Sequence, residues 1–159
     1  MTITSAICNS FKQEILVEGH NFTNGTDAFK LSLYSSDSAT LSKATTAYTA
    51  PADATANPTN TYEVTTTSSG YTAGGKALTN TGVGLTSTTA FTDFSDVSFT
   101  SASFTANGAM IYNTTTNGGS NTTDAVCIIA FGSDKTATNG TFEIQFPAND
   151  SSNAIIRLA

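Results

Sequence analysis

The run from Asp124 to Phe146 constrains the fold more than any other stretch of this chain. Its first part, Ala125–Phe131, is a continuous apolar segment too short for an ordinary helix, which predicts a strand covered on both faces. Its last part alternates in polarity. Phe142, Ile144 and Phe146 share one face, which predicts a strand with one side in the core and the other in water.

A polar segment, Gly132–Gly140, lies between these two strands. It ends in Asn139–Gly140, a pair that readily adopts positive φ. We therefore predict a β-hairpin in which the strand around Phe142–Phe146 returns beside Ala125–Phe131.

Composition extends this reading to the whole chain. Charged residues make up 11% of the sequence, against roughly 25% in an average soluble domain, so hydroxyl and amide groups must cover much of the surface. Threonine, a β-branched residue that suits a pleated surface, accounts for roughly a fifth of the 159 residues. We expect one all-β domain spanning residues 1–159, a β-sandwich or jelly-roll-like fold of about eight strands with one short N-terminal helix.

The helix is predicted over residues 10–18. Ser10 and Gln13 have the spacing of a capping box, and Gly19 is expected to close the helix in the left-handed conformation. The apolar side chains expected to face the sheet recur at a spacing of four: Ile7, Phe11 and Ile15, with Leu16 beside them.

Further strands are predicted from alternating or apolar runs: Phe29–Tyr34, Lys76–Val83, the segment of Phe91, Val97 and Phe99, Phe104–Tyr112 with a bulge at Asn107–Gly108, and Ala154–Leu158. The polar segment 35–69 is predicted to be a long excursion from the sheet, since Pro51 and Pro58 exclude a central strand. Its expected anchors are Tyr48 and Tyr62–Val64.

No residue is assigned to a catalytic, cofactor-binding or metal-binding site. His20 is the only histidine, and it is interpreted as a capping or hydrogen-bonding group. Asp93 and Asp96 are three residues apart, and they are interpreted as solvated turn residues because no further ligands of a calcium loop accompany them.

The segment Gly70–Gly75 superficially resembles a phosphate-binding loop. Its spacing fits neither nucleotide-binding motif, and Lys76 is not followed by Ser or Thr, so a bend or close backbone approach is expected. Cys8 and Cys127 both lie in apolar surroundings, which favours two buried thiols over a disulfide.

Charge and hydropathy bear on the partners. The formal net charge is −6 and no basic run occurs, so we expect no nucleic-acid partner. No segment approaches the roughly 18 apolar residues needed to span a bilayer, so we expect no membrane partner. The N-terminus lacks a charged region followed by a long apolar one, so we expect no export signal. The chain also lacks a Gly-x-Ser-x-Gly elbow or another constellation of nucleophile and base, which favours a protein without enzymatic activity.

Several segments spread along the chain resemble a family of small virion proteins of tailed bacteriophages, especially phages of aquatic bacteria. The resemblance lies in residues 3–16 with His20–Phe22, in Phe29–Tyr34, Thr45–Tyr48, Gly70–Gly75 and Gly108–Asn113, and in the ending Asn153–Ala159. It implies a structural protein of the virion, assembled in the cytoplasm of the host bacterium.

Within that family, a capsid decoration (cement) protein that stabilises the head is the favoured function. Its partners would be the major capsid protein and further copies of the chain as a homo-oligomer. The alternative is a tail component, such as a tube, adaptor or fibre protein, with other tail proteins as partners. A carbohydrate- or cell-surface-binding module is third. Candidate interfaces are Thr2–Ile7, Pro51–Asn60 and the C-terminal strand.

Overall fold

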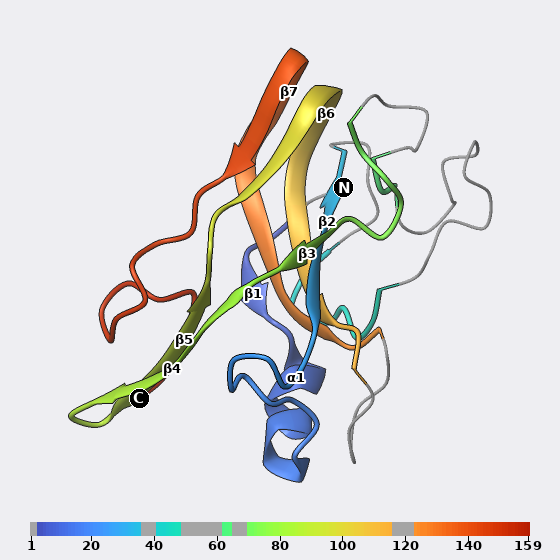
Figure 1. Ribbon diagram of the computed structural model, residues 1–159. Helices are drawn as coiled ribbons and strands as arrows, with labels where there is room; N and C mark the ends of the chain where they lie inside the picture. The colour runs from blue at the N-terminus through green and yellow to red at the C-terminus, as the bar shows by residue number, and fades with distance from the viewer. Residues whose placement is uncertain (1–2, 36–40, 49–61, 65–69, 116–122) are drawn as a thin grey trace.

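The computed structural model describes residues 3–35, 41–48, 62–64, 70–115 and 123–159. In these residues the chain is mostly strand, with one short helix near the N-terminus (Figure 1). The predicted all-β fold is confirmed.

The elements follow one another with the N-terminal helix early and all longer strands after it. In chain order they are β1 (Ala6–Ile7), α1 (Asn9–Glu14), the 3₁₀ turn η1 (Ile15–Val17), β2 (Phe29–Tyr34), β3 (Lys76–Leu78), β4 (Asn80–Thr86), β5 (Thr89–Phe94), β6 (Val97–Asn113), β7 (Ala125–Ile144) and β8 (Ile156–Leu158).

The strands form two antiparallel sheets. The larger has the order β1-β7-β6-β2-β3 and the smaller has the order β4-β5-β8. The predicted strand Lys76–Val83 is therefore two strands: β3 pairs with β2 in the large sheet, whereas β4 pairs with β5 in the small one. The C-terminal strand β8 pairs with β5, so it belongs to the chain's own small sheet.

The core lies mainly on the large sheet. Residues Ala125–Ile128 are all at most 2% exposed, which confirms that the predicted run is covered on both faces over these four residues, whereas Ile129, Ala130 and Phe131 are half-buried. Leu31 and Leu33 of β2 and Ile111 of β6 are fully buried beside it. The strand predicted over Phe29–Tyr34 is confirmed as β2.

The β6–β7 ribbon folds back on itself. The two strands pair from Val97 opposite Ile144 to Tyr112 opposite Ala125. The rings of Phe99 and Phe104 are nevertheless 6.0 Å apart, whereas a straight strand would separate these residues by about 17 Å. Both strands therefore bend sharply together, as Figure 1 shows at the end of the molecule opposite α1.

The predicted hairpin between these two segments is wrong, because both lie on one bent strand. Ala125–Phe131 and the strand around Phe142 belong to one strand, β7, and each pairs with β6 rather than with the other. The expected return of the chain does occur, because the rings of Phe131 and Phe142 are 6.2 Å apart. Asn139 has a positive φ of 49°, as the turn prediction required, and so has Gly132, with φ of 75°, but both conformations fall within the bent strand.

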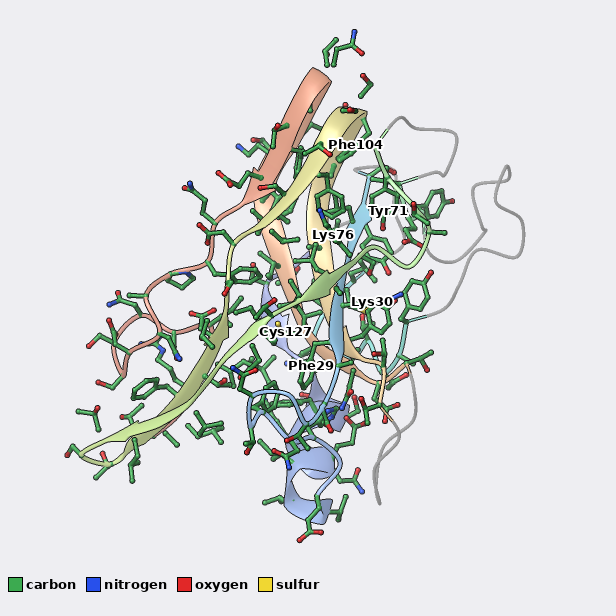
Figure 2. All side chains as sticks on the ribbon, in the orientation of Figure 1. Phe29, Lys30, Tyr71, Lys76, Phe104 and Cys127 are labelled. Carbon is green, nitrogen blue, oxygen red and sulfur yellow. The ribbon has the colours of Figure 1, made fainter. Side chains whose placement is uncertain are left out.

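The bend divides the ribbon into two packed halves with aromatic side chains between them. The Phe104 ring lies 5.1 Å from that of Phe142 and 5.8 Å from that of Tyr71. Figure 2 shows Tyr71 and Phe104 close together near the bend. The predicted irregularity at Asn107–Gly108 is confirmed by a register shift between Ala106 and Gly108.

The N-terminal helix differs from the prediction at both ends. Its N-cap is Cys8 without a side-chain hydrogen bond, so the Ser10 capping box is wrong. Glu18, not Gly19, takes the left-handed conformation, with φ of 60°. Gly19 instead provides room for a close approach, since its amide donates to the Glu14 carbonyl oxygen at 2.8 Å and a Cβ on Gly19 would lie 2.9 Å from that oxygen.

Gly75 provides a test of how tightly the loop before β3 packs on β2. Its φ is +73°, and a Cβ there would lie 1.8 Å from the Leu31 carbonyl oxygen. Gly25 has a similar φ of +82°, but its Cβ would meet nothing within 4 Å. We expect Gly75→Ala to lower the free energy of unfolding by at least about 3 kcal/mol, against about 1 kcal/mol for the control Gly25→Ala. Equal losses in urea unfolding would contradict the packing argument.

Candidate functional site

His20 has the hydrogen-bonding role that the sequence predicts. It is buried, its Nε2 lies 2.8 Å from a Glu14 carboxylate oxygen, and its Nδ1 lies 3.0 Å from the Asn113 amide nitrogen. The same amide nitrogen donates to Asp27 at 2.9 Å. His20 therefore connects the end of the helical segment to the last residue of β6.

The two aspartates of the 93–96 segment differ from each other. Asp96 is exposed, as predicted, and accepts from the Phe146 amide at 2.8 Å. Asp93 is fully buried, so its assignment as a solvated turn residue is wrong. It accepts from the amides of Phe94 and Ile155, and its burial raises the pKa of the carboxyl group. Asp93 thereby connects β5 to the segment that leads into β8.

The two cysteines are buried free thiols, as expected. Burial, with a contribution from Glu14, raises the pKa of Cys8 to about 12. Burial also raises the pKa of Cys127 well above its ordinary value. Both thiols are therefore protonated near neutral pH, which is the unreactive form. Within the ranges that the structure describes, no three His, Cys, Asp or Glu side chains gather as a metal site.

The glycine-rich segment 70–75 makes the close backbone approaches that the sequence predicts. A Cβ on Gly70 would lie 2.6 Å from the Thr100 carbonyl oxygen. The Gly74 amide donates to the carboxylate of Glu63 at 2.7 Å, and the Gly74 carbonyl accepts from the Tyr112 hydroxyl at 2.7 Å. The segment thus surrounds a carboxylate of the chain itself.

Glu63 is the centre of a buried polar cluster that we call the Glu63 cluster, composed of Glu63, Tyr48, Tyr71, Gly74 and Tyr112. Glu63 is 2% exposed. Its carboxylate accepts from the hydroxyl groups of Tyr48 at 2.9 Å and Tyr71 at 2.5 Å. The rings of Tyr48 and Tyr112 stack with centroids 4.5 Å apart. The predicted anchors Tyr48, Glu63 and Val64 are buried and thereby confirmed, whereas Tyr62 is half-buried.

The electrostatics of the Glu63 cluster are set by burial. Burial raises the pKa of Glu63, and the donors Tyr71, Gly74 and Tyr48 offset part of that rise. Burial and the neighbouring carboxylate together raise the pKa of Tyr71. The Tyr71 hydroxyl also accepts from the Leu33 amide at 3.0 Å, so the cluster continues into β2, beside Tyr71 in Figure 2. With its carboxylate enclosed by protein donors, the cluster acts as a structural connection.

A cleft opens where β7 folds back. It has a volume of about 470 Å³ and is lined by apolar side chains from both halves of the strand, with Lys135 and Glu143 among the polar groups. Sequence reasoning missed it, because the cleft exists only once the ribbon bends. We call it the β7 cleft.

A second surface lies at the end of the molecule opposite the bend. The large apolar side chains that are exposed in the described residues are all on η1, β4 and β8: Leu16 (84%), Val17 (52%), Val83 (61%), Leu85 (71%) and Leu158 (49%). We call this surface the apolar end. Leu16, predicted to lie beside the buried stripe of the helix, instead faces solvent.

Strand register explains how the apolar end forms. Leu85 of β4 lies opposite Ala90 of β5, and Ala90 lies opposite Leu158 of β8. These three side chains form one row across the small sheet. A groove of about 70 Å³ lies beside the row, between Ile15 and Val83.

The three segments predicted as interfaces differ in how they are placed in the structure. From Ile3 onward the N-terminal segment is built into the fold, since Ile3 is buried and β1 pairs with β7. Pro51–Asn60 lies outside the described residues. The C-terminal strand contributes the half-exposed Leu158 to the apolar end.

The chain matches no protein-family model, no curated protein and no solved structure. In the part that the structure describes, no helix is long and apolar enough to cross a membrane.

The pH dependence of stability tests the Glu63 cluster. Because burial raises the pKa of Glu63 above 4.5, the folded chain binds the proton of the Glu63 carboxyl group more tightly than the unfolded chain does. The resulting stability is present below about pH 4.5 and is lost as the pH rises through the raised pKa. We expect Glu63→Gln to remove this contribution, which cannot exceed about 1.4 kcal/mol per pH unit. The measurement is urea unfolding across pH, and parallel profiles for wild type and Glu63→Gln would refute the assignment.

The Tyr71 hydroxyl offers a second test. Tyr71→Phe removes the group that accepts from the Leu33 amide and donates to Glu63, leaving a buried N–H without its partner. We expect a loss of about 2 kcal/mol in the free energy of unfolding. Tyr62→Phe, at a half-buried tyrosine outside the cluster, should cost much less. Similar losses for the two variants would count against the bridging role.

Proposed function

We propose that this chain is a non-enzymatic structural protein of a bacteriophage particle, and that it decorates the outside of the capsid. Its partners are the major capsid protein and further copies of itself. The sequence resemblance to small phage virion proteins supports the viral setting. The acidic, threonine-rich composition is compatible with a protein that works through its surface.

The apolar end is the observation that carries this proposal. Exposed apolar surface is unfavourable in water, by about 25 cal/mol per Å², and larger contiguous patches mark sites of interaction. Leu85, Ala90 and Leu158 form a row on rigid strands, and Leu16 is 84% exposed on the neighbouring turn. Such a patch fits a protein surface better than a small polar ligand.

The opposite end has a different character. The bend of β7 carries Asp134 and Lys135, which are both exposed, and is rich in exposed hydroxyl side chains. A decoration protein needs one face that binds the shell and another that remains in water. The apolar end and the polar bend meet these two requirements.

A tail component is the second candidate, and the β7 cleft favours it. Subunits that assemble head to tail into rings use two different surfaces, one on each side of the contact. The β7 cleft and the apolar end are two such surfaces at opposite ends of the folded molecule. A carbohydrate-binding module gains no support from Tyr34, Tyr48, Tyr71 and Tyr112, which are all buried.

Co-sedimentation with particles tests the proposal. Purified protein is mixed with capsids and, separately, with tails of the phage that encodes it, and the bound fraction is imaged by electron microscopy. We expect saturable binding over the capsid with on the order of hundreds of copies, as in closed symmetric shells. A few copies confined to the tail would favour the second candidate, and binding to neither would refute both.

A pair of matched variants assigns the binding surface. Leu16→Lys with Val17→Lys places two charges on the apolar end, where both side chains are exposed. We expect capsid affinity to fall at least about tenfold. Thr100→Lys with Thr138→Lys adds the same charge at exposed positions near the bend and should bind as wild type does. If the variant near the bend instead lost more capsid affinity than the Leu16 and Val17 variant, the contact would lie at the bend.

A further inference from the structure

The outer edge of β4 is open along half its length. β4 pairs with β5 through a two-residue turn, with Thr86 opposite Thr89. In such a hairpin, hydrogen-bonded and non-hydrogen-bonded pairs alternate away from the turn. Thr86 and Gly84 therefore bond to β5, whereas the N–H and C=O groups of Val83 and Leu85 point away from it.

Other residues cover only the first half of this edge. The Asn149 side chain donates to the carbonyl oxygen of Gly82 at 3.1 Å, just before the regular part of the strand. Along Val83–Thr86, no element in the described part of the chain pairs with the outward side. Val83 and Leu85 are also 61% and 71% exposed, so the same two residues present free backbone groups and apolar side chains.

Open strand edges are usually protected by charges, proline or bulges. The outer edge of β7 beyond Ile128 is protected in this way, since it carries Asp134, Lys135 and Glu143 and its pairing with β6 is repeatedly shifted. The hairpin Asn80–Thr89 contains no charged residue and no proline. Its one register shift falls before Val83, outside the open stretch.

We propose that the open edge of β4 is where two copies of this chain pair, antiparallel and related by a two-fold axis through Gly84. In this register Val83 faces Leu85 of the second copy, and Leu85 faces its Val83. All four residues then use their outward backbone groups in the new ladder. The two small sheets become one six-stranded sheet in the order β8-β5-β4-β4-β5-β8.

The residue at the centre suits this register. Gly84 would face Gly84 of the second copy in a non-hydrogen-bonded pair, in which the Cα atoms are only about 4.5 Å apart. The ring of Phe91, the cross-strand partner of Gly84, covers Gly84 on the face of the sheet where a Cβ would project, and a Cβ there would meet the ring at 2.4 Å. The strand is therefore held against β5 while its centre carries no side chain that would obstruct a second copy.

The charges near the β4 edge do not oppose the pairing of two copies. The chain carries a formal net charge of −6, so two copies repel each other over most of their surfaces. The hairpin itself is uncharged, and the nearest charged residues of the small sheet are Asp93 on β5, which is buried, and Arg157 on β8. The pairing therefore brings apolar and backbone groups together without placing like charges opposite one another.

The β4 edge is the surface through which copies of the proposed decoration protein meet. The pairing rests on the proposed function only in that the paired copies are placed on a particle. A contact made by two short strands buries little area and corresponds to a weak dimer, with a dissociation constant between about 1 μM and 1 mM. Many such contacts on one shell would reinforce each other, leaving Leu16 and Val17 free to contact the capsid.

Sedimentation velocity of the purified chain, without any particle, tests the pairing. We expect a monomer–dimer equilibrium that shifts with concentration up to about 1 mM. The double variant Val83→Lys with Leu85→Lys should be at least about tenfold weaker in self-association, because it places lysines along the edge. The matched control Leu16→Lys with Val17→Lys carries the same added charge on η1 and should dimerise as wild type does.

Amide hydrogen exchange supplies a readout specific to strand pairing. In the monomer the Val83 and Leu85 amides face solvent and exchange fast, so their protection should rise with protein concentration. This measurement needs no variant and decides the matter if the lysine variant does not fold. Three outcomes would each overturn the proposal. They are a wild-type chain that is still monomeric at about 1 mM, a β4 variant that dimerises as strongly as wild type, and a dimer in which these two amides stay unprotected. None of these outcomes depends on whether the chain binds capsids.

Discussion

The antiparallel ladder between β6 and β7 is the interaction on which the rest of the structure depends. It runs from Val97 opposite Ile144 to Tyr112 opposite Ala125, and it remains paired through a sharp bend. Because the ribbon folds over, its two halves pack face to face with aromatic rings between them. One half continues the chain from β5, and the other forms the centre of the large sheet, so this ladder connects the two sheets.

The Glu63 cluster is a second constraint, and it depends on the first. The Tyr112 hydroxyl comes from β6, and the Tyr71 hydroxyl receives the amide of Leu33 in β2. Segments with little regular structure are thereby fixed to the sheet by hydrogen bonds to one carboxylate rather than by strand pairing. Burying this acid is costly, and the three donors offset that cost. The cluster therefore holds Tyr48 and Glu63 against the large sheet without exposing a reactive group.

The bend also separates the surface into two ends of different chemistry. One end presents the β7 cleft among polar residues, and the other presents the row Leu85, Ala90 and Leu158. The proposed capsid contact and the proposed pairing of β4 both use the apolar end, the first through its exposed side chains and the second through the backbone edge of Val83 and Leu85. Leu16 and Val17 belong to the turn after the helix, whereas Val83 and Leu85 belong to a strand edge. A shell protein needs both kinds of contact, one to the shell and one to its neighbours.

The sequence by itself determined that the chain is mostly strand, that Ala125–Ile128 is covered on both faces, and that both cysteines are buried, because these properties follow from local patterns of apolar residues. It could not determine that Ala125–Phe131 and Phe142 lie on one bent strand, since alternation identifies the apolar face and not the partner that covers it. Tertiary structure likewise decided that Asp93 is buried and Leu85 is exposed. Asp93 is buried by a segment some sixty residues later in the chain, near Ile155, and Leu85 lies on a sheet that only three strands form. Both outcomes depend on contacts between distant segments, which no local pattern encodes.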